Sequence, residues 1–233
     1  MTARFAYVGT ELELFGQAKN WKAYWSEHLR PFVRGDVLEV GAGIGLTTKA
    51  LAVGTERSWT CLEPDAAMAA EIAARPDLPV KPQIIVGTTA DLPAEPRYDA
   101  IAYIDVLEHI TDDRGEMARA ERLLRPGGHV VALSPAHQFL FSPFDKAIGH
   151  ERRYTRRTLA AAAPPGLAPV KIAYLDSLGM ILSLGNRLVL GQTMPTAKQI
   201  VFWDTRVVPT SRWLDQLFAG RVGKSVIGVW RKL

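Results

Sequence analysis

The sequence has 233 residues, of which 48% are hydrophobic and 22% are charged, as in an ordinary globular protein. This length suits one large domain that can bury its core without covalent cross-links. The lone cysteine, Cys61, excludes an internal disulfide and a metal cluster built on cysteines, and it fits a reducing cytoplasm. We expect no signal peptide in residues 1–16, and the apolar stretch 178–191 is too short to span a bilayer.

The charge balance is mildly basic, with 28 Lys and Arg against 24 Asp and Glu, a net charge of +4. This excess is too weak to indicate nucleic acid by itself. Five basic residues gather within twelve positions: Lys146, Arg152, Arg153, Arg156 and Arg157. Such a patch favours an anionic group on a ligand or a surface, with a solvated helix start as the alternative.

The predicted elements alternate through the first half of the chain. Large apolar residues at helical spacing predict a helix over 11–31, which Pro31 ends. Short apolar runs predict strands at 36–40, 58–62, 84–86, 100–104 and 130–133. Helices are predicted at 46–53, 66–74 and 112–124, and Arg125-Pro-Gly-Gly128 predicts a turn.

Beyond Pro135 the alternation weakens. A helix is predicted at 156–163, and two further strands at 170–174 and 226–230. The order predicts a Rossmann-like α/β fold: a seven-stranded, mostly parallel sheet with helices on both faces. The hydrophobic insertion 175–224 can form a lid, a dimer face, an amphipathic surface against a membrane, or an extra helical layer.

A glycine-rich turn, Gly41-Ala-Gly43-Ile-Gly45, follows the first predicted strand. Glycines let the backbone turn sharply and approach a ligand closely, and the following helix presents free N–H groups. A dinucleotide loop would require glycine at position 46, which is Leu46. Glu39, two residues before the first glycine, would repel a pyrophosphate but suits a ligand with an ammonium group. The spacing therefore favours S-adenosylmethionine, with a turn that binds nothing as the alternative.

The segment Val37-Leu-Glu-Val-Gly-Ala-Gly-Ile-Gly45 resembles the first motif of the class I S-adenosylmethionine-dependent methyltransferases. The resemblance implies one methyltransferase domain over 1–233. Its predicted parts are an N-terminal helical region that covers the domain at 1–35, a cofactor-binding half at 36–134 and a substrate-side half at 135–233.

Further motifs extend the resemblance in chain order. Glu63 closes the second strand, where an α/β nucleotide fold holds the ribose hydroxyls, and Pro64 follows it. Relatives place an acid directly after the glycine that follows the third strand, but Thr88 stands there. We therefore assign the adenine contact to Thr88 and the backbone of Thr89, with Asp91 as a competitor.

The fourth strand runs into Asp105, in a segment that resembles the fourth motif of the family. The resemblance implies that Asp105 lies near the reacting methyl group. Methyl transfer is an in-line displacement, so the protein positions the reactants and supplies a base if the nucleophile carries a proton. His109 and His150 are the candidate bases, with a helix-capping role as the alternative for His109. No metal ligand is expected.

His150 belongs to the string Gly-His-Glu-Arg-Arg-Tyr-Thr155, which resembles a subgroup of these methyltransferases from bacterial envelope-polymer and natural-product settings. Adjacent arginines can clamp a carboxylate or phosphate, so Arg152 and Arg153 are predicted to bind the acceptor. Tyr154 is predicted to take part in catalysis, and either to hydrogen-bond the acceptor or to close over the cofactor. In the alternative, Thr155 caps the next helix and the arginines are solvated.

The sequence thus predicts methyl transfer to an O or N atom of a small, anionic, sugar- or lipid-linked acceptor. An RNA methyltransferase, a cofactor-binding scaffold without turnover and a nicotinamide-dependent oxidoreductase are the alternatives. No RNA-binding module accompanies the short basic patch, so neither RNA nor DNA is expected as a partner. Peripheral membrane contact, and the choice between monomer and homodimer, stay open.

Overall fold

The structure, a computed structural model, describes residues 11–189 and 195–233. Its sheet has the strand order β3-β2-β1-β4-β5-β7-β6. The strands are β1 (Asp36–Val40), β2 (Ser58–Glu63), β3 (Gln83–Val86), β4 (Tyr98–Ile104), β5 (Leu124–Pro135), β6 (Leu167–Leu175) and β7 (Ser225–Lys232). Only β7 runs antiparallel to its neighbours, β5 and β6. The predicted seven-stranded, mostly parallel sheet is confirmed.

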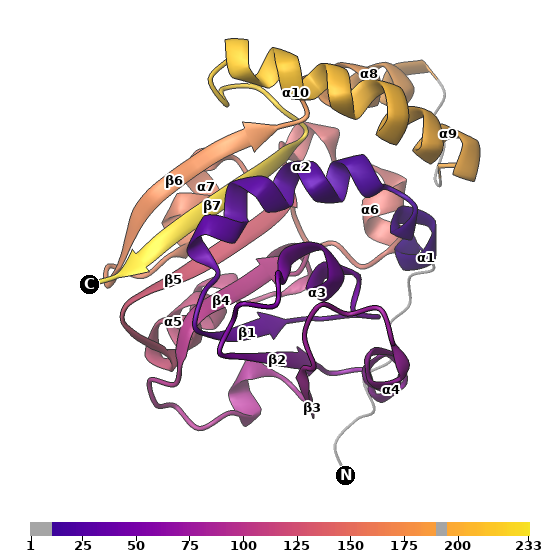
Figure 1. The fold of residues 1–233 in the computed structure, drawn as a ribbon. Coiled ribbons are helices and arrows are strands. Elements are labelled where there is room, and N and C mark those ends of the chain that lie inside the picture. The colour runs from indigo at the N-terminus through magenta and orange to yellow at the C-terminus, as the bar shows by residue number, and fades with distance from the viewer. Residues whose placement is uncertain (1–10, 190–194) are drawn as a thin grey trace.

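Helices cover both faces of the sheet (Figure 1). They are α1 (Glu11–Gly16), α2 (Lys19–Leu29), α3 (Leu46–Leu51), α4 (Ala66–Ala74), α5 (Asp113–Leu123), α6 (Pro143–Ala147), α7 (Arg156–Ala162), α8 (Ser177–Val189), α9 (Ala197–Phe202) and α10 (Val208–Leu217). The helices α2 and α3 contribute to the core on one face, and α5 and α7 contribute to the core on the other.

Side chains that alternate along each strand divide between these two cores. In β1, Val37 belongs to the same apolar cluster as Trp25 of α2, whereas Leu38 belongs to the cluster of Met117 of α5. All four side chains are buried. Burial of a large apolar side chain stabilises the fold by roughly 1.5–3 kcal/mol, so both faces hold the sheet in place. The apolar runs of the strands follow from this two-sided burial.

Two boundaries differ from the sequence prediction. The helix expected over 11–31 is divided into α1, α2 and a 3-10 turn at Arg30–Phe32 that contains Pro31. Residues 125–128, expected as a turn before the fifth strand, are part of β5. The pairing of β5 with β4 shifts register there, and Gly127 has a φ of +79°. The chain does turn locally, but within the strand.

The insertion forms an extra helical layer, which we call the cap: residues 177–189 and 197–217. Figure 1 shows α8, α9 and α10 above the sheet, with α10 over α2. A wide π-turn at Trp203–Val207 joins α9 to α10. Pro209 lacks the N–H that a regular helix would use there, and the wide turn accommodates it. Residues 190–194 of the predicted insertion lie outside the described residues.

Buried hydrogen bonds hold the cap against the rest of the molecule. The carboxylate of Asp215 in α10 accepts a hydrogen bond from the Tyr24 hydroxyl of α2 at 2.8 Å. It also accepts one from the backbone N–H of Ser177, at the start of α8, at 3.0 Å. One buried acid thus joins three helices. Within the described ranges, we find no helix with the length and apolarity required to cross a membrane.

Candidate functional site

The carboxyl ends of β1, β2 and β4 bring the predicted cofactor residues to one edge of the sheet. Sheet order reverses between β1 and β4, because the chain continues from β1 to β2 on one side and reaches β4 on the other. In an open α/β sheet, ligands bind in the crevice at such a point. The glycine turn follows β1, Glu63 ends β2 and Asp105 follows β4.

The glycine turn has a backbone that side chains would not tolerate. Gly41, Gly43 and Gly45 have φ values of +66°, +55° and +80°, in the left-handed region that favours glycine. A Cβ atom on Gly41 would lie 2.7 Å from Cγ2 of Val106. A Cβ atom on Gly43 would meet only Leu12, at 3.6 Å. The glycine at position 43 therefore leaves backbone open for a ligand.

Glu63 connects the end of β2 to the glycine turn. It is 4% exposed, and its Oε2 accepts a hydrogen bond from the N–H of Gly43 at 2.7 Å. Its Oε1 accepts one from the N–H of Asp65 at 2.9 Å, and Pro64 between them is half-buried. Burial raises the pKa of Glu63. Each carboxylate oxygen keeps a lone pair, so Glu63 has the capacity to accept from a pair of vicinal hydroxyls.

Glu39 lies deeper than the sequence indicates. It is 1% exposed, and its Oε2 accepts hydrogen bonds from Thr48 Oγ1 at 2.6 Å and Trp59 Nε1 at 2.8 Å. Burial raises the pKa of Glu39 to about 7, against the opposing effect of these hydrogen bonds. The carboxylate thus holds α3 beneath the glycine turn. Direct contact with a ligand ammonium group stays a prediction that this burial does not favour.

The residues predicted to hold the adenine lie after β3. Asp91 accepts hydrogen bonds from the N–H and the hydroxyl of Thr88, at 2.8 and 2.9 Å, so the two residues form a helix cap. These bonds lower the pKa of Asp91. Thr89 is buried, and its hydroxyl donates to Glu116 at 2.7 Å. Thr88 is exposed, which leaves it and the loop backbone as the predicted adenine contacts.

Asp105 occupies an uncommon backbone position at the end of β4, with a φ of +54°. Its side chain is exposed, yet the dense protein around it raises its pKa to about 6, against the opposing charges of His150, Lys22 and Lys224. The two lysines come from α2 and from the residue before β7. Asp105 is therefore close to many protein atoms but still accessible to solvent. Such a position is the one expected of a residue at the base of a ligand-binding crevice.

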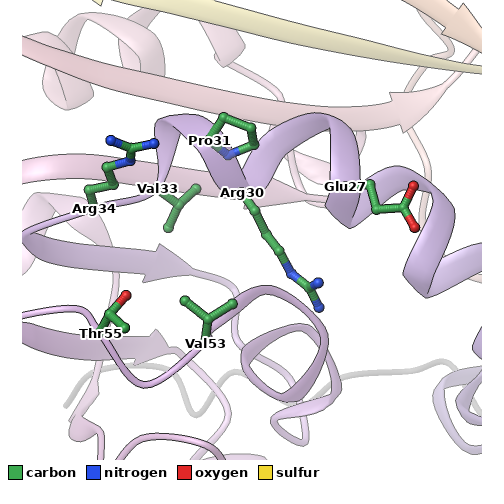
Figure 2. A pocket seen from close by; sticks show the side chains of 7 residues that line it. All are labelled: Glu27, Arg30, Pro31, Val33, Arg34, Val53 and Thr55. Atoms are coloured by element: carbon green, nitrogen blue, oxygen red, sulfur yellow. The ribbon is translucent and has the colours of Figure 1, made fainter.

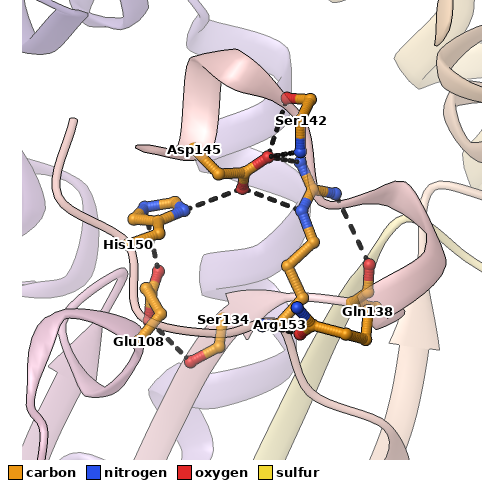
Figure 3. Close-up of polar contacts among 8 residues, drawn as sticks. Glu108, Ser134, Gln138, Ser142, Asp145, His150 and Arg153 are labelled. Carbon is orange, nitrogen blue, oxygen red and sulfur yellow. Dashed lines mark hydrogen bonds and ion pairs between the residues drawn. The ribbon is translucent and has the colours of Figure 1, made fainter. Parts of the chain in front are cut away.

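The two predicted histidines lie together. The ring centroids of His109 and His150 are 4.6 Å apart. Nδ1 of His150 lies 2.9 Å from Oδ1 of Asp145, and Nε2 lies 4.0 Å from Oε1 of Glu108 (Figure 3). Burial and the charge of His150 lower the pKa of His109 to about 4, although a hydrogen bond to the Gly149 backbone opposes this shift. The two candidate bases are thus neighbours, and their catalytic role stays a prediction.

Asp145 is the centre of a polar network that sequence reasoning missed. It accepts hydrogen bonds from Nε and Nη2 of Arg153, at 2.8 and 2.9 Å, and from Ser142 (Figure 3). Burial would raise the pKa of Asp145, but the bonds from His150 and Arg153 hold it well below its usual range. The spacing of Ser142 and Asp145 fits a capping box, which is the signal that could have revealed this carboxylate.

The predicted arginine clamp is not supported. Arg153 is paired with Asp145, as described above. Arg152 donates to the carbonyl oxygens of Ile110 and Thr111, at 2.8 and 2.9 Å, and lies 3.1 Å from Asp113. Both guanidinium groups therefore have internal partners, which leaves little capacity to bind an acceptor bidentately.

Tyr154 is likewise engaged in contacts within the protein, whereas the sequence predicts that it contacts the acceptor. It is 2% exposed, and its hydroxyl donates to Asp113 at 2.7 Å, while the carbonyl oxygen of Leu107 lies 3.2 Å from it. Burial raises its pKa, so the hydroxyl keeps its proton at neutral pH and does not take up the proton of an acceptor. Thr155 caps α7 by accepting from the N–H of Thr158, as the alternative interpretation of this string expects.

Two surface pockets of the described chain contain no residue of the glycine turn. One of about 610 Å³ is lined by residues of α2 and of the loops that precede β1 and β2 (Figure 2). The lining residues are Glu27, Arg30, Pro31, Val33, Arg34, Val53 and Thr55. It opens at the amino ends of the strands, opposite the glycine turn. A second pocket, of about 430 Å³, lies where the segments after β4 and β5 meet, and the predicted acceptor residues Arg152, Arg153 and Tyr154 are all part of its lining.

Comparison with known proteins agrees with this geometry. Residues 38–132, which run from β1 to β5, match the family described as "Methyltransferase domain". The described sheet is therefore that of the Rossmann-like α/β methyltransferase fold.

The chain is also similar in sequence to an enzyme of known function. The chain is 33% identical over 105 residues to a ubiquinone biosynthesis O-methyltransferase of Alkalilimnicola ehrlichii, a match that covers 41% of this chain. The aligned part spans 39% of the length of that curated relative.

Two solved structures share the fold at low sequence identity. The N-methyltransferase NodS of Bradyrhizobium japonicum WM9, in complex with S-adenosylhomocysteine, aligns with a TM-score of 0.60 and 14% identity. The alignment covers 93% of this chain and 88% of NodS. Geranyl diphosphate C-methyltransferase of Streptomyces coelicolor aligns with a TM-score of 0.62 and 15% identity, over 90% of this chain and 77% of that enzyme.

Proposed function

We propose that this protein is an S-adenosylmethionine-dependent methyltransferase that acts on an O or N atom of a small molecule. The family match over 38–132 and the methyltransferases that share the fold support this assignment. The observation that carries it is the position of Glu63. Its buried carboxylate bridges to the N–H of Gly43, where an adenosyl ribose would lie between the end of β2 and the glycine turn.

The residues of the crevice fit this cofactor. Gly43 leaves the loop backbone uncovered, and Glu63 supplies two acceptor oxygens for the ribose hydroxyls. Thr88, or its competitor Asp91, would hold the adenine, and Asp105 would lie near the methionine end. The cofactor supplies a methyl group activated by the positive sulfur. The glycine turn and Glu63 therefore mainly hold that methyl group in line with the acceptor.

The transfer requires an acceptor with a free electron pair. That pair forms a bond to the methyl carbon while the carbon–sulfur bond breaks, and the electrons of the broken bond stay on sulfur, which leaves S-adenosylhomocysteine. An acceptor hydroxyl or ammonium group must lose its proton. We assign this proton to His150, with His109 beside it, because the hydrogen bond of its Nδ1 with the carboxylate of Asp145 orients His150.

A lipid-linked acceptor fits the outer surface of the cap. Trp213, Leu217 and Phe202 are 61%, 65% and 58% exposed. The acidic residues of 176–224 are all buried: Asp176, Asp204 and Asp215. Basic residues exposed in the same segment are Lys198, Arg206, Arg212 and Arg221. An apolar surface with exposed charges that are all positive favours contact with an anionic membrane. The relative from ubiquinone biosynthesis supports a lipid-linked acceptor, since ubiquinone is a lipid.

Ligand binding tests the function directly. We expect S-adenosylhomocysteine to bind with saturable heat in calorimetry and to raise the melting temperature, whereas NADH has no effect. Turnover is tested with S-adenosylmethionine labelled in its methyl group and a bacterial lipid extract, a polar metabolite extract or RNA as acceptor. Label in RNA would favour the RNA alternative. Cofactor binding with no label transferred to any of the three would favour the scaffold.

Membrane contact is tested separately. We expect the protein to sediment with vesicles that contain phosphatidylglycerol and to stay in solution with vesicles of phosphatidylcholine alone. Trp213→Ala should weaken this binding several-fold. Val53→Ala, which removes an exposed apolar side chain outside the cap, should leave it unchanged. Equal binding by both variants would contradict the role of this surface.

A further inference from the structure

Three side chains at the carboxyl ends of β4 and β5 direct ligand atoms toward one point. Glu108, His109 and His150 each offer one such atom, and these atoms all lie within 4.8 Å of one another. Glu108 is fully buried, and its Oε2 accepts a hydrogen bond from Ser134 at 2.9 Å. Its other oxygen, Oε1, is buried without a hydrogen-bond partner in the described chain. That oxygen lies 4.0 Å from Nε2 of His150.

Neighbouring groups hold both histidine rings in place. His150 binds Asp145 through Nδ1, at 2.9 Å. His109 forms its bond with the Gly149 backbone. A ligating histidine commonly donates its second ring N–H to a carboxylate or a backbone carbonyl, which fixes its orientation. Arg153 and Ser142 in turn hold Asp145, so the outer part of a metal site is already assembled (Figure 3).

We propose that Glu108, His109 and His150 bind a divalent first-row transition-metal ion such as Zn²⁺ or Mn²⁺. Two imidazoles and one carboxylate are a ligand set that such ions favour, with a further position left open. Ligand atoms around a tetrahedral zinc lie about 3.4 Å apart, given bonds of about 2.0–2.1 Å. Oε1 of Glu108 and Nε2 of His150 are 4.0 Å apart in the structure, so a bound ion would draw these two atoms closer together. The ion would also give the unpartnered Oε1 of Glu108 a partner, which removes the cost of burying it.

The bound ion would activate the acceptor at the reacting methyl group. A metal ion lowers the pKa of an oxygen bound at its open position, so an acceptor hydroxyl could lose its proton to water at neutral pH. The resulting metal-bound oxygen would keep an electron pair for the methyl carbon. In this state His150 would be a ligand and not a free base. This role rests on the proposed function, whereas binding of the ion does not.

Metal titration tests the site without any turnover. The protein is first treated with a chelator, dialysed and then titrated with Zn²⁺ in a calorimeter. We expect one ion per chain, and we expect Co²⁺ in its place to give the visible absorption of a tetrahedral or five-coordinate site. His150→Gln and Glu108→Gln should each weaken Zn²⁺ binding at least tenfold. His129→Gln, a half-buried histidine on β5 outside the cluster, is the matched control and should bind as the parent does.

The outcomes separate this site from the proposed function. Thermal melting of each variant identifies any that fails to fold, and His109→Gln serves as a further variant if Glu108→Gln is unstable. No binding of Zn²⁺ or Co²⁺ by the folded parent would overturn the proposal. Equal affinity in the parent and in folded His150→Gln would also overturn it. S-adenosylhomocysteine binding, measured on the same samples after chelation, reports on the cofactor site independently.

Discussion

The backbone N–H of Trp21 donates a hydrogen bond to Oδ1 of Asp204 at 2.8 Å, across 183 positions of the sequence. The other oxygen of Asp204 accepts from the backbone and side chain of Asn20, both at 3.1 Å. The residue that precedes α2, Ala18, has no side-chain group to cap the helix. Asp204, from the cap, therefore supplies the negative charge that the first turn of α2 lacks.

Asp204→Ala should destabilise the protein by about 2–3 kcal/mol, because it leaves the buried N–H of Trp21 and the partly buried N–H of Asn20 without their charged acceptor. Denaturation in urea measures this free energy of unfolding. Glu27→Ala is the control, since Glu27 pairs with Arg212 at the surface, and it should cost less than about 1 kcal/mol. Equal losses in the two variants would contradict the capping role of Asp204.

Glu63→Gln should weaken the affinity for S-adenosylhomocysteine about 10- to 100-fold, because hydrogen bonds to a charged acceptor contribute about 1.5–3 kcal/mol. Calorimetry measures the dissociation constant. Glu71→Gln changes an exposed glutamate on α4 and should leave the constant unchanged. An unchanged constant in folded Glu63→Gln would place the ribose elsewhere.

Arg153→Ala should lower the melting temperature and reduce kcat, because Asp145 would keep its burial but lose its guanidinium partner. The sequence alone predicts a different result, a higher acceptor KM from loss of the arginine clamp. Arg156→Ala, at the start of α7, is the control and should change neither quantity. A raised acceptor KM with an unchanged melting temperature would instead support the prediction that Arg153 binds the acceptor.

Glu39→Gln should remove a pH dependence of stability. Burial raises the pKa of Glu39 to about 7 in the folded protein, from 4.5 in the unfolded chain. Between these values the folded state binds more protons than the unfolded state, so stability falls as pH rises from about 4.5 to 7. The 2.5-unit difference corresponds to roughly 3 kcal/mol.

Urea denaturation of the parent and Glu39→Gln at pH 5 and pH 8 tests this linkage. The variant should gain stability relative to the parent as the pH rises. The amide oxygen of glutamine can still accept from Thr48 and Trp59, so the hydrogen bonds are matched. If the free energies of unfolding of parent and variant differed by the same amount at both pH values, the raised pKa of Glu39 would be contradicted.

Local signals predicted the fold well in the first half. The alanine-rich segment 66–74 forms α4 with the predicted bounds, and Asp65 caps it. Glycines at 41, 43 and 45 do adopt left-handed backbone. These features depend on neighbours in sequence, which is why periodicity and turn chemistry are sufficient to find them.

Long-range polar partners could not be predicted in the same way. Arg153 and Tyr154 lie in a string that suggests ligand binding, yet Asp145 and Asp113 take up their polar groups. Glu39 precedes a ligand loop but points into the core, toward Trp59. A side chain at such a position can face a ligand or a buried partner, and only the tertiary structure decides between them. The predicted domain boundaries and the assigned cofactor contacts remain predictions.

The position of β7 between β5 and β6 has a consequence for assembly. In the described sheet β6 is hydrogen-bonded only to β7, so β6 is joined to the rest of the sheet through the antiparallel pairing of β7 with β5. Residues that pair across β5 and β7, such as Val130 and Trp230, are far apart in sequence, and closing so long a loop is slow. The glycine turn and β1 to β4 rely on nearer contacts. We therefore expect the ligand-binding edge to become ordered first during refolding, and the β6–β7 edge to be completed last.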